Sequence, residues 1–273
     1  MLNTHNHRQF STVKLNSFMK VYLDNNIFIY LENESLTLSD LENTIENKID
    51  KIFFSASHIQ ETLEIRGEDE TQRINRIEKR LKTIEKITAN NYLYHDQGDN
   101  FSELIESPYV VLETITQVPL AQKMMKGFSS FISESQKTMI RETLNLDPQK
   151  LNNYSPKEVV DHLSTKLSEH NPEYTFLHMI EMGISFHPDG KTFGRSHRTN
   201  GIFELLDMLG YWKDKATDKS NYARLWDASH TFHASYCDYF VTDDKRTINK
   251  ARVVYDIFNV KTKIITSKIN NNE

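Results

Sequence analysis

Apolar and polar residues alternate in a strand-and-helix order at the start of the chain. An apolar run from Phe18 to Leu23 has the length of a buried strand, and it ends in Asp24 and two amides. Residues 36–47 carry Leu and Ile at helical spacing. A short apolar run at 52–54 predicts a second strand, and residues 55–65 predict the helix after it. This order predicts a parallel sheet.

The alternation stops in the middle of the chain and resumes near its end. Residues 67–190 show mainly helical spacing, apart from Tyr92-Leu93-Tyr94, a candidate short strand or buried loop, so we expect a mostly helical insertion. The resumed pattern predicts helices at 199–209, 221–236 and 247–258 and strands at 239–242 and 262–266. We therefore expect a discontinuous sheet domain from residues 18–66 and 191–266, with loose termini at 1–17 and 267–273.

The composition supports a packed, soluble protein. The chain has 273 residues, of which 38% are hydrophobic and 26% are charged. Its net charge of -5 excludes a general polyanion binder, so nucleic acid would have to contact a local basic patch. The single cysteine, Cys237, excludes an internal disulfide, and no apolar run predicts a membrane span or a signal peptide. We expect a cytoplasmic location and no membrane partner.

Acidic residues follow the predicted strands. Asp24 ends the first strand, and Asp243 and Asp244 end a late one. Because the carboxyl ends of parallel strands share one edge of a sheet, these acids are expected there together. Glu61 lies about one turn into the helix after the second strand, so it is expected near the same edge.

Asp227 is placed by a length argument. The predicted helix rises roughly 15 Å from Asp227 to Cys237, at ~1.5 Å per residue. The following strand returns roughly 13 Å to Asp243, at ~3.3 Å per residue. Asp227 is therefore expected level with the strand-end acids. By the same measure Asp238 lies at the far end of the strand and is expected to be structural.

Clustered carboxylates predict a cation site. Such groups repel one another unless a cation neutralises them, and their hard oxygens suit Mg²⁺ or Mn²⁺. Ions of this kind activate water and stabilise the leaving oxygen in phosphodiester hydrolysis. The predicted catalytic and metal-binding residues are Asp24, Glu61, Asp227 and Asp244, with Asp243 as a further metal ligand.

Three segments resemble the PIN-domain nuclease family. Residues 21–27, Val-Tyr-Leu-Asp-Asn-Asn-Ile, resemble its opening strand, and residues 57–61, Ser-His-Ile-Gln-Glu, resemble its second motif. Residues 227–245 are similar to its late segment, in which an acid on a helix precedes a strand ending in Val-Thr-x-Asp. The alignment gives supporting roles to Asn26 and Thr242 and puts Asp244 at the last acidic position. The resemblance covers about half of the chain.

The resemblance implies a three-layer α/β/α PIN-like fold with a central parallel sheet. It also implies metal-dependent endonuclease activity, commonly on RNA. The large helical insertion departs from the compact members of the family. Two alternatives stay open: a nuclease acting on single-stranded or flap DNA, and a PIN-like scaffold that binds a protein partner through the insertion. A protein regulator and a homo-oligomer are further candidate partners. An aspartyl phosphatase of the haloacid-dehalogenase type is disfavoured because Asn26 stands where that mechanism needs an acid.

Basic residues near the predicted edge are candidates for contacts with substrate phosphates. They are Lys191, Arg195 and Arg198, where the chain returns to the sheet, and Lys245 and Arg246, after the last acids. Arg73, Arg76 and Arg80 share a helical face with several glutamates, which predicts a solvated, salt-bridged surface instead. His230 and His233 have a spacing that zinc sites use, but no third ligand completes a motif, so packing or hydrogen bonding is expected.

Overall fold

The computed structural model describes residues 19–267 except 97, 117–131, 187–188 and 215–217. The side chains of residues 116, 191 and 218–222 also lie outside the description. A parallel sheet of four strands forms the centre of the fold. In spatial order its strands are β2 (Ile49–Phe53), β1 (Met19–Leu23), β5 (Tyr239–Val241) and β6 (Lys263–Ile265).

Residues 19–116 contribute helices and a hairpin around β1 and β2. The helices are α1 (Asn25–Glu32), α2 (Leu38–Ile45), α3 (Ala56–Leu63), α4 (Glu70–Thr88) and α5 (Pro108–Thr116). The hairpin consists of β3 (Asn91–His95) and β4 (Phe101–Ile105), paired antiparallel. Phe54 forms a parallel bridge with Tyr92, so the hairpin continues from the β2 side of the sheet.

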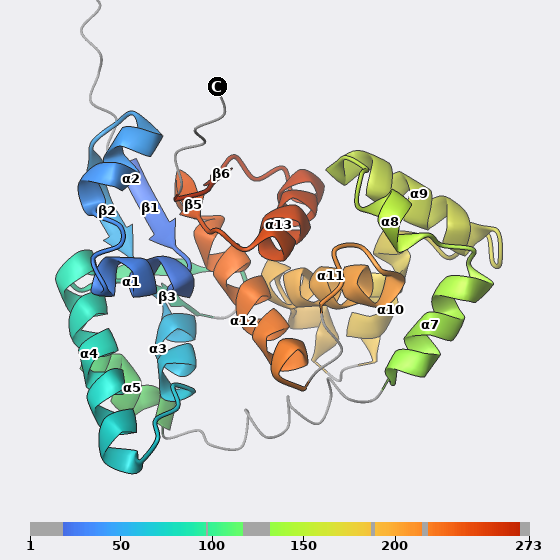
Figure 1. Ribbon diagram of the computed structural model, residues 1–273. Coiled ribbons are helices and arrows are strands. Elements are labelled where there is room, and N and C mark those ends of the chain that lie inside the picture. The colour runs from blue at the N-terminus through green and yellow to red at the C-terminus, as the bar shows by residue number, and fades with distance from the viewer. Residues whose placement is uncertain (1–18, 97, 117–131, 187–188, 215–217, 268–273) are drawn as a thin grey trace, which may run out of the picture.

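The rest of the chain is mainly helical. Its helices are α7 (Glu134–Thr143), α8 (Pro148–Leu151), α9 (Pro156–Ser168), α10 (Phe176–Ser185), η1 (Gly190–Thr192), α11 (Arg195–Leu209), α12 (Asp218–Ala234) and α13 (Lys245–Ile257). Figure 1 shows α12 and α13 between the early elements at the left and α7–α10 at the right. The mixed α/β class predicted from the sequence is confirmed.

The order in which strands are added to the sheet reverses between β1 and β5, although the two strands are parallel. From β1 the chain moves outward to β2, and it later returns to the other side of β1 as β5. In open α/β sheets, such a switch point leaves a crevice at the carboxyl ends of the two neighbouring strands, where ligands bind. Here those ends are Leu23 and Val241, which pair directly. The fold therefore directs attention to the residues that follow them.

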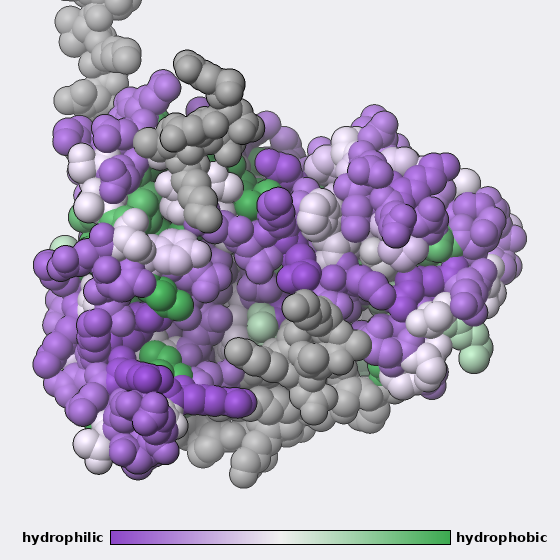
Figure 2. Space-filling view, in the orientation of Figure 1, coloured by the Kyte–Doolittle hydropathy of each residue, from purple (hydrophilic) through white to green (hydrophobic). Residues whose placement is uncertain are grey.

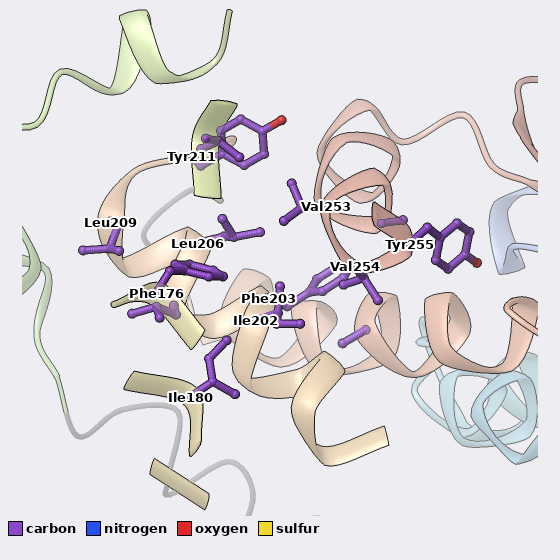
Figure 3. Packing of buried hydrophobic residues seen from close by; sticks show 14 of the residues in the cluster. Phe176, Ile180, Ile202, Phe203, Leu206, Leu209, Tyr211, Val253, Val254 and Tyr255 are labelled. Carbon is purple, nitrogen blue, oxygen red and sulfur yellow. The ribbon is translucent and has the colours of Figure 1, made fainter. Parts of the chain in front are cut away.

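Alternate strand residues supply two hydrophobic clusters, as expected for a sheet buried on both faces. Val21 and Leu23 join one cluster with residues of α1, α2, α4 and α5. Tyr22 and Phe240 join the other, which contains residues of α9–α13. Figure 3 shows part of this second cluster, where Ile202, Phe203 and Leu206 of α11 lie near Val253 and Val254 of α13. The core thus extends from the sheet into the late helices.

The packing crosses the boundary predicted at residue 67. Leu81 and Ile84 of α4 share a hydrophobic cluster with Val21 of β1, although they lie in the predicted insertion. The structure also contains four elements that the sequence pattern did not predict individually: α1, β4, α8 and η1. Ser267 was assigned to a loose terminus, but its side chain is buried. The four sheet strands lie within about three residues of their predicted limits.

The surface is mainly polar on the face shown in Figure 2, with hydrophobic side chains gathered only in small patches there. Across the described residues, no helix combines the length and the apolar character needed to cross a membrane.

Candidate active site

Asp24 occupies the switch point between β1 and β5. Its backbone N–H donates to the Val241 carbonyl at 2.9 Å, so the pairing of the strands extends to it. Its Oδ1 accepts from the Asn25 backbone N–H at 2.7 Å and caps α1. Its Oδ2 accepts from Thr242 Oγ1 at 2.7 Å. Asp24 is only 4% exposed, so a carboxylate is held in the interior at the end of the central strands.

Thr242 connects Asp24 to the next acid. While its hydroxyl donates to Asp24, its Oγ1 also accepts from the Asp244 backbone N–H at 3.3 Å. Asp244 caps α13, since its Oδ1 accepts from the N–H groups of Arg246 and Thr247 at 2.7 and 3.1 Å. Thr242 is fully buried, so it fixes the two acidic segments relative to each other.

Glu61 and Asp227 come from facing helices. Glu61 lies on α3, and its Oε2 bonds with His230 Nε2 of α12 at 2.8 Å. Asp227 lies three residues before His230, about one turn earlier on α12. The hydroxyls of Ser57 and Ser229 form a second link between these helices at 2.6 Å. The chain folds so that α3 and α12 present their acids to one region.

The electrostatics show that Asp24, Asp244 and Glu61 all lie within range of Asp227. Burial raises the pKa of Asp227 well above its usual value, and the negative charges of Asp24, Asp244 and Glu61 raise it further. Burial also raises the pKa of Asp24, with Glu61 adding to the shift while His230 and Thr242 oppose it. Like charges have thus been brought together without full compensation.

Asp243 is not directed to this group. Its Oδ1 accepts from the Ser267 backbone N–H at 2.8 Å, and its Oδ2 accepts from the Ser267 hydroxyl. The Asp243 carboxylate therefore ties the end of β5 to the segment after β6. The structure brings together Asp24, Glu61, Asp227 and Asp244, but it gives Asp243 this separate bonding role.

Two predicted phosphate-binding residues do not lie at the acidic edge. Arg195 bonds with Asp99 at 3.2 Å and with the Tyr236 hydroxyl at 2.9 Å. Tyr236 precedes β5, so this contact lies at the opposite end of the strand from Thr242. Arg198 bonds with both Glu181 oxygens, at 2.6 and 2.8 Å. The expected placement of these arginines was wrong, because the chain returns to the sheet at the amino-terminal ends of the strands, away from the acidic edge.

The other predicted basic residues have mixed positions. Lys245 is exposed and Arg246 is partly exposed on the first turn of α13, directly after Asp244. Arg246 approaches Asp214 to 3.7 Å. The side chain of Lys191 lies outside the described residues. Asn26 is exposed on the first turn of α1, next to the Asp24 carboxylate segment.

The Arg80 side chain is buried, contrary to the solvated surface expected for its helix face. It is 6% exposed, and it donates to Glu32 at 2.7 Å and to the Asn25 side chain at 3.0 Å. Arg73 and Arg76 donate to the carbonyls of Leu63 and Arg66. Arg76 is nevertheless exposed and Arg73 pairs with Glu70 at 2.9 Å, as expected for a salt-bridged surface, so the expectation was wrong for Arg80 alone of these three arginines. Arg80 reaches the residue beside Asp24.

His230 is the residue at this site whose importance the sequence pattern did not reveal. It is fully buried, and its two ring nitrogens face Glu61 and the Tyr22 hydroxyl. His233 instead directs Nδ1 to the Ser229 carbonyl at 2.8 Å. The two histidines therefore do not form a zinc pair. The usable signal was their spacing from Asp227 on one helix, since His230 falls one turn after it.

The donor chemistry of the edge fits a hard cation. Carboxylate oxygens are the ligands that Mg²⁺ and Mn²⁺ prefer, and a bound cation would favour the ionised forms of Asp24 and Asp227, whose pKa values burial and neighbouring acids raise. Within the described part of the chain, no three His, Cys, Asp or Glu side chains stand close enough to hold a metal ion. Cation binding therefore requires these side chains to move closer together.

Comparison with known proteins gives no relative. No family model matches the chain, and neither a curated protein nor a solved structure matches it.

Proposed function

We propose that the chain is a metal-dependent nuclease that hydrolyses phosphodiester bonds, with RNA as the expected substrate. The observation that carries the proposal is the meeting of Asp24, Glu61, Asp227 and Asp244 at the switch point of the parallel sheet. A set of like charges at the carboxyl ends of parallel strands is costly for the fold, and it is typical of a functional site. The residue pattern shared with PIN-domain nucleases supports the same assignment.

The proposed roles follow from the positions of the side chains. Asp24, Glu61, Asp227 and Asp244 would hold Mg²⁺ or Mn²⁺. When bound, such an ion activates water and neutralises charge on the leaving oxygen. Thr242 keeps Asp24 and Asp244 at a fixed separation. Lys245 and Arg246 follow Asp244 in the chain and would contact the substrate phosphate.

The PIN-like three-layer fold forms part of the proposal. It is supported by the discontinuous parallel sheet, by the two hydrophobic clusters on its faces, and by the placement of Thr242 and Asp244 after β5. The helices from α7 to α10 would then be additions to that core.

A cleavage assay tests the proposal. Labelled single-stranded RNA, single-stranded DNA and flap DNA are incubated with the purified chain and Mn²⁺, and then with Mn²⁺ plus EDTA. We expect RNA cleavage that EDTA abolishes. Cleavage of DNA in place of RNA would reassign the substrate but keep the chemistry. Cleavage that survives EDTA, or the absence of cleavage together with the absence of Mn²⁺ binding, contradicts the proposal.

A further inference from the structure

We propose that His230 is a positioning residue that sets the direction of the Glu61 carboxylate, and that Tyr22 holds His230 in that orientation. This inference rests on the proposed function, because it assigns Glu61 to the cation site. It adds two residues, His230 and Tyr22, that the family resemblance does not assign.

The bond between His230 and Glu61 has a defined direction. An ionised carboxylate only accepts hydrogen bonds, so His230 Nε2 carries the proton and donates it to Glu61 Oε2 at 2.8 Å. The Glu61 side chain is 21% exposed, whereas that of His230 is 0% exposed. Glu61 is therefore held from the protein side and remains open on the solvent side. One of its oxygens has a fixed place, which limits the rotation of the carboxylate.

His230 is held from behind by Tyr22. The Tyr22 hydroxyl lies 2.9 Å from His230 Nδ1 and 2.6 Å from Ser55 Oγ. Tyr22 and Ser55 are fully buried, so water does not compete for these bonds. A flip of the His230 ring would exchange nitrogen for carbon and break the contacts on both sides. The contacts of the two ring nitrogens with Glu61 and Tyr22 therefore both fix the orientation of the His230 ring.

His58 packs against the ring of His230. Its Nδ1 accepts from the Ser55 backbone N–H at 3.0 Å, so its proton is on Nε2, which donates to the Leu23 carbonyl at 2.7 Å. The His58 and His230 ring centroids are 4.5 Å apart. Because His230 is enclosed by these rings and fully buried, it does not reach substrate. Its role is exerted through Glu61.

The spacing along the chain links this arrangement to the other acids. Tyr22 lies on β1 two residues before Asp24, which follows the strand directly in an extended conformation, so the two side chains leave the same face of the sheet. His230 lies three residues after Asp227, on the same side of α12. The Tyr22–His230–Glu61 series therefore joins the three elements that carry Asp24, Asp227 and Glu61. A shift in one element would be transmitted to the acid on the next.

Mn²⁺ binding provides a direct test. Isothermal titration calorimetry of the full chain is compared for wild type, His230→Leu, His230→Gln and the matched control His233→Leu. Loss of a supporting residue in the outer shell of a metal site typically costs about 10–100-fold in affinity. We expect a loss in that range for His230→Leu. His230→Gln, whose side-chain N–H can still donate to Glu61, should recover most of the affinity.

His233→Leu separates positioning from packing. His233 is also buried on α12, but it bonds with the Ser229 carbonyl and not with Glu61. This variant should bind Mn²⁺ as wild type does. Equal losses of affinity in His233→Leu and His230→Leu would show that packing of α12 is responsible, and they would overturn the inference.

Tyr22→Phe keeps the inference testable if His230→Leu does not fold. It removes only the hydroxyl that orients His230, and we expect a several-fold weaker Mn²⁺ affinity with the fold retained. Wild-type affinity in a folded His230→Leu, or in Tyr22→Phe when His230→Leu does not fold, overturns the inference while leaving the proposed function in place. A wild-type chain that neither binds Mn²⁺ nor cleaves nucleic acid overturns the proposed function, and the inference fails with it.

Discussion

Two groups of charged side chains that both include residues of α12 differ in how their charge is balanced. The acidic edge holds Asp24, Glu61, Asp227 and Asp244, with His230 as its buried basic partner. A second group, which we call the ion network, consists of Asp207, Asp214, Arg224, Lys250 and Lys137. Arg224 lies 2.9 Å from Asp207, and Lys250 lies 3.0 Å from Asp214.

The two groups shift the pKa of their acids in opposite directions. Burial works to raise the pKa of Asp207, but Lys250, Arg224 and Lys137 outweigh it and hold the pKa below its usual value. Burial and neighbouring acids raise the pKa of Asp227. The ion network therefore joins α7, α11, α12 and α13 with paired charges, as a structural element does. At the acidic edge, burial and neighbouring acids raise the pKa values of Asp24 and Asp227, and no paired cations outweigh that effect among the described residues.

The largest expected effect is the loss of cleavage on changing the acidic edge. Metal assistance is worth several kcal/mol, so Asp24→Asn should reduce the cleavage rate by about 10³-fold or more. The Asn side chain can still accept hydrogen bonds at this position, so the fold should be retained. Rates with Mn²⁺ and thermal unfolding of the variant measure the two effects. Asp244→Asn, which preserves a good helix cap, should behave in the same way.

Wild-type turnover in both variants would show that this edge is not the catalytic site.

The ion network should give the opposite result. Asp207→Asn leaves Arg224 and Lys250 buried without that charge, which should lower the free energy of unfolding by about 3–5 kcal/mol. Cleavage per folded molecule should stay near wild type. Urea unfolding measures the loss. Glu204→Gln is the control, because the Glu204 side chain that pairs with Arg224 is 39% exposed and its loss should cost about 1 kcal/mol.

A small loss for Asp207→Asn, close to that of Glu204→Gln, would contradict the view that the network stabilises the fold.

A smaller change in the free energy of unfolding should appear on acidification. Burial lowers the pKa of His233 to about 3, whereas the unfolded chain has an ordinary value near 6.5. Below pH 6.5 the unfolded state binds more protons than the folded state, so stability falls as pH falls through the window from 6.5 towards 3. At pH 5 this one residue should cost about 2 kcal/mol. Urea unfolding at pH 7.5 and pH 5 measures the difference.

His233→Leu should remove about 2 kcal/mol of this pH dependence. His58, whose pKa burial also lowers, should preserve part of it. An unchanged pH dependence in His233→Leu would mean that His233 does not stay neutral in the folded chain.

The smallest expected effect is a gain in stability at the acidic edge. In EDTA, the folded Asp227 carboxyl keeps its proton at pH values where the unfolded chain has lost it, so stability falls as pH rises above about 4. Asp227→Asn should therefore raise the free energy of unfolding at pH 8, on the order of 1 kcal/mol. Added Mn²⁺ should stabilise wild type and not the variant. A destabilised Asp227→Asn in EDTA would contradict the uncompensated charge.

Sequence reasoning reached the sheet and the acids because both depend on local patterns. The buried run ending at Asp24 shows β1, and rise per residue places Asp227 level with Asp244. β4 was missed because most of its side chains are exposed, so no apolar alternation marks it. The α1 segment was missed because its start, Asn25 and Asn26, has the composition of a turn.

The remaining errors concern long-range packing. Lys137, Arg224 and Lys250 look like surface residues in the sequence, and only the positions of four helices show that they are buried. The Asp243 side chain points away from the acidic edge and accepts a hydrogen bond from Ser267. This bond joins the segment after β5 to the segment after β6. No local spacing encodes such contacts.

The pairing of β1 with β5 has a consequence for synthesis on the ribosome. β1 leaves the ribosome before β5, the strand that covers one of its two edges, which arrives more than 200 residues later. Until then β1 exposes unpaired backbone groups and an apolar side, which are features that promote aggregation. The Asp24–Thr242 bond cannot form before that point either. A growing chain therefore has no assembled acidic edge until β5 has been synthesised.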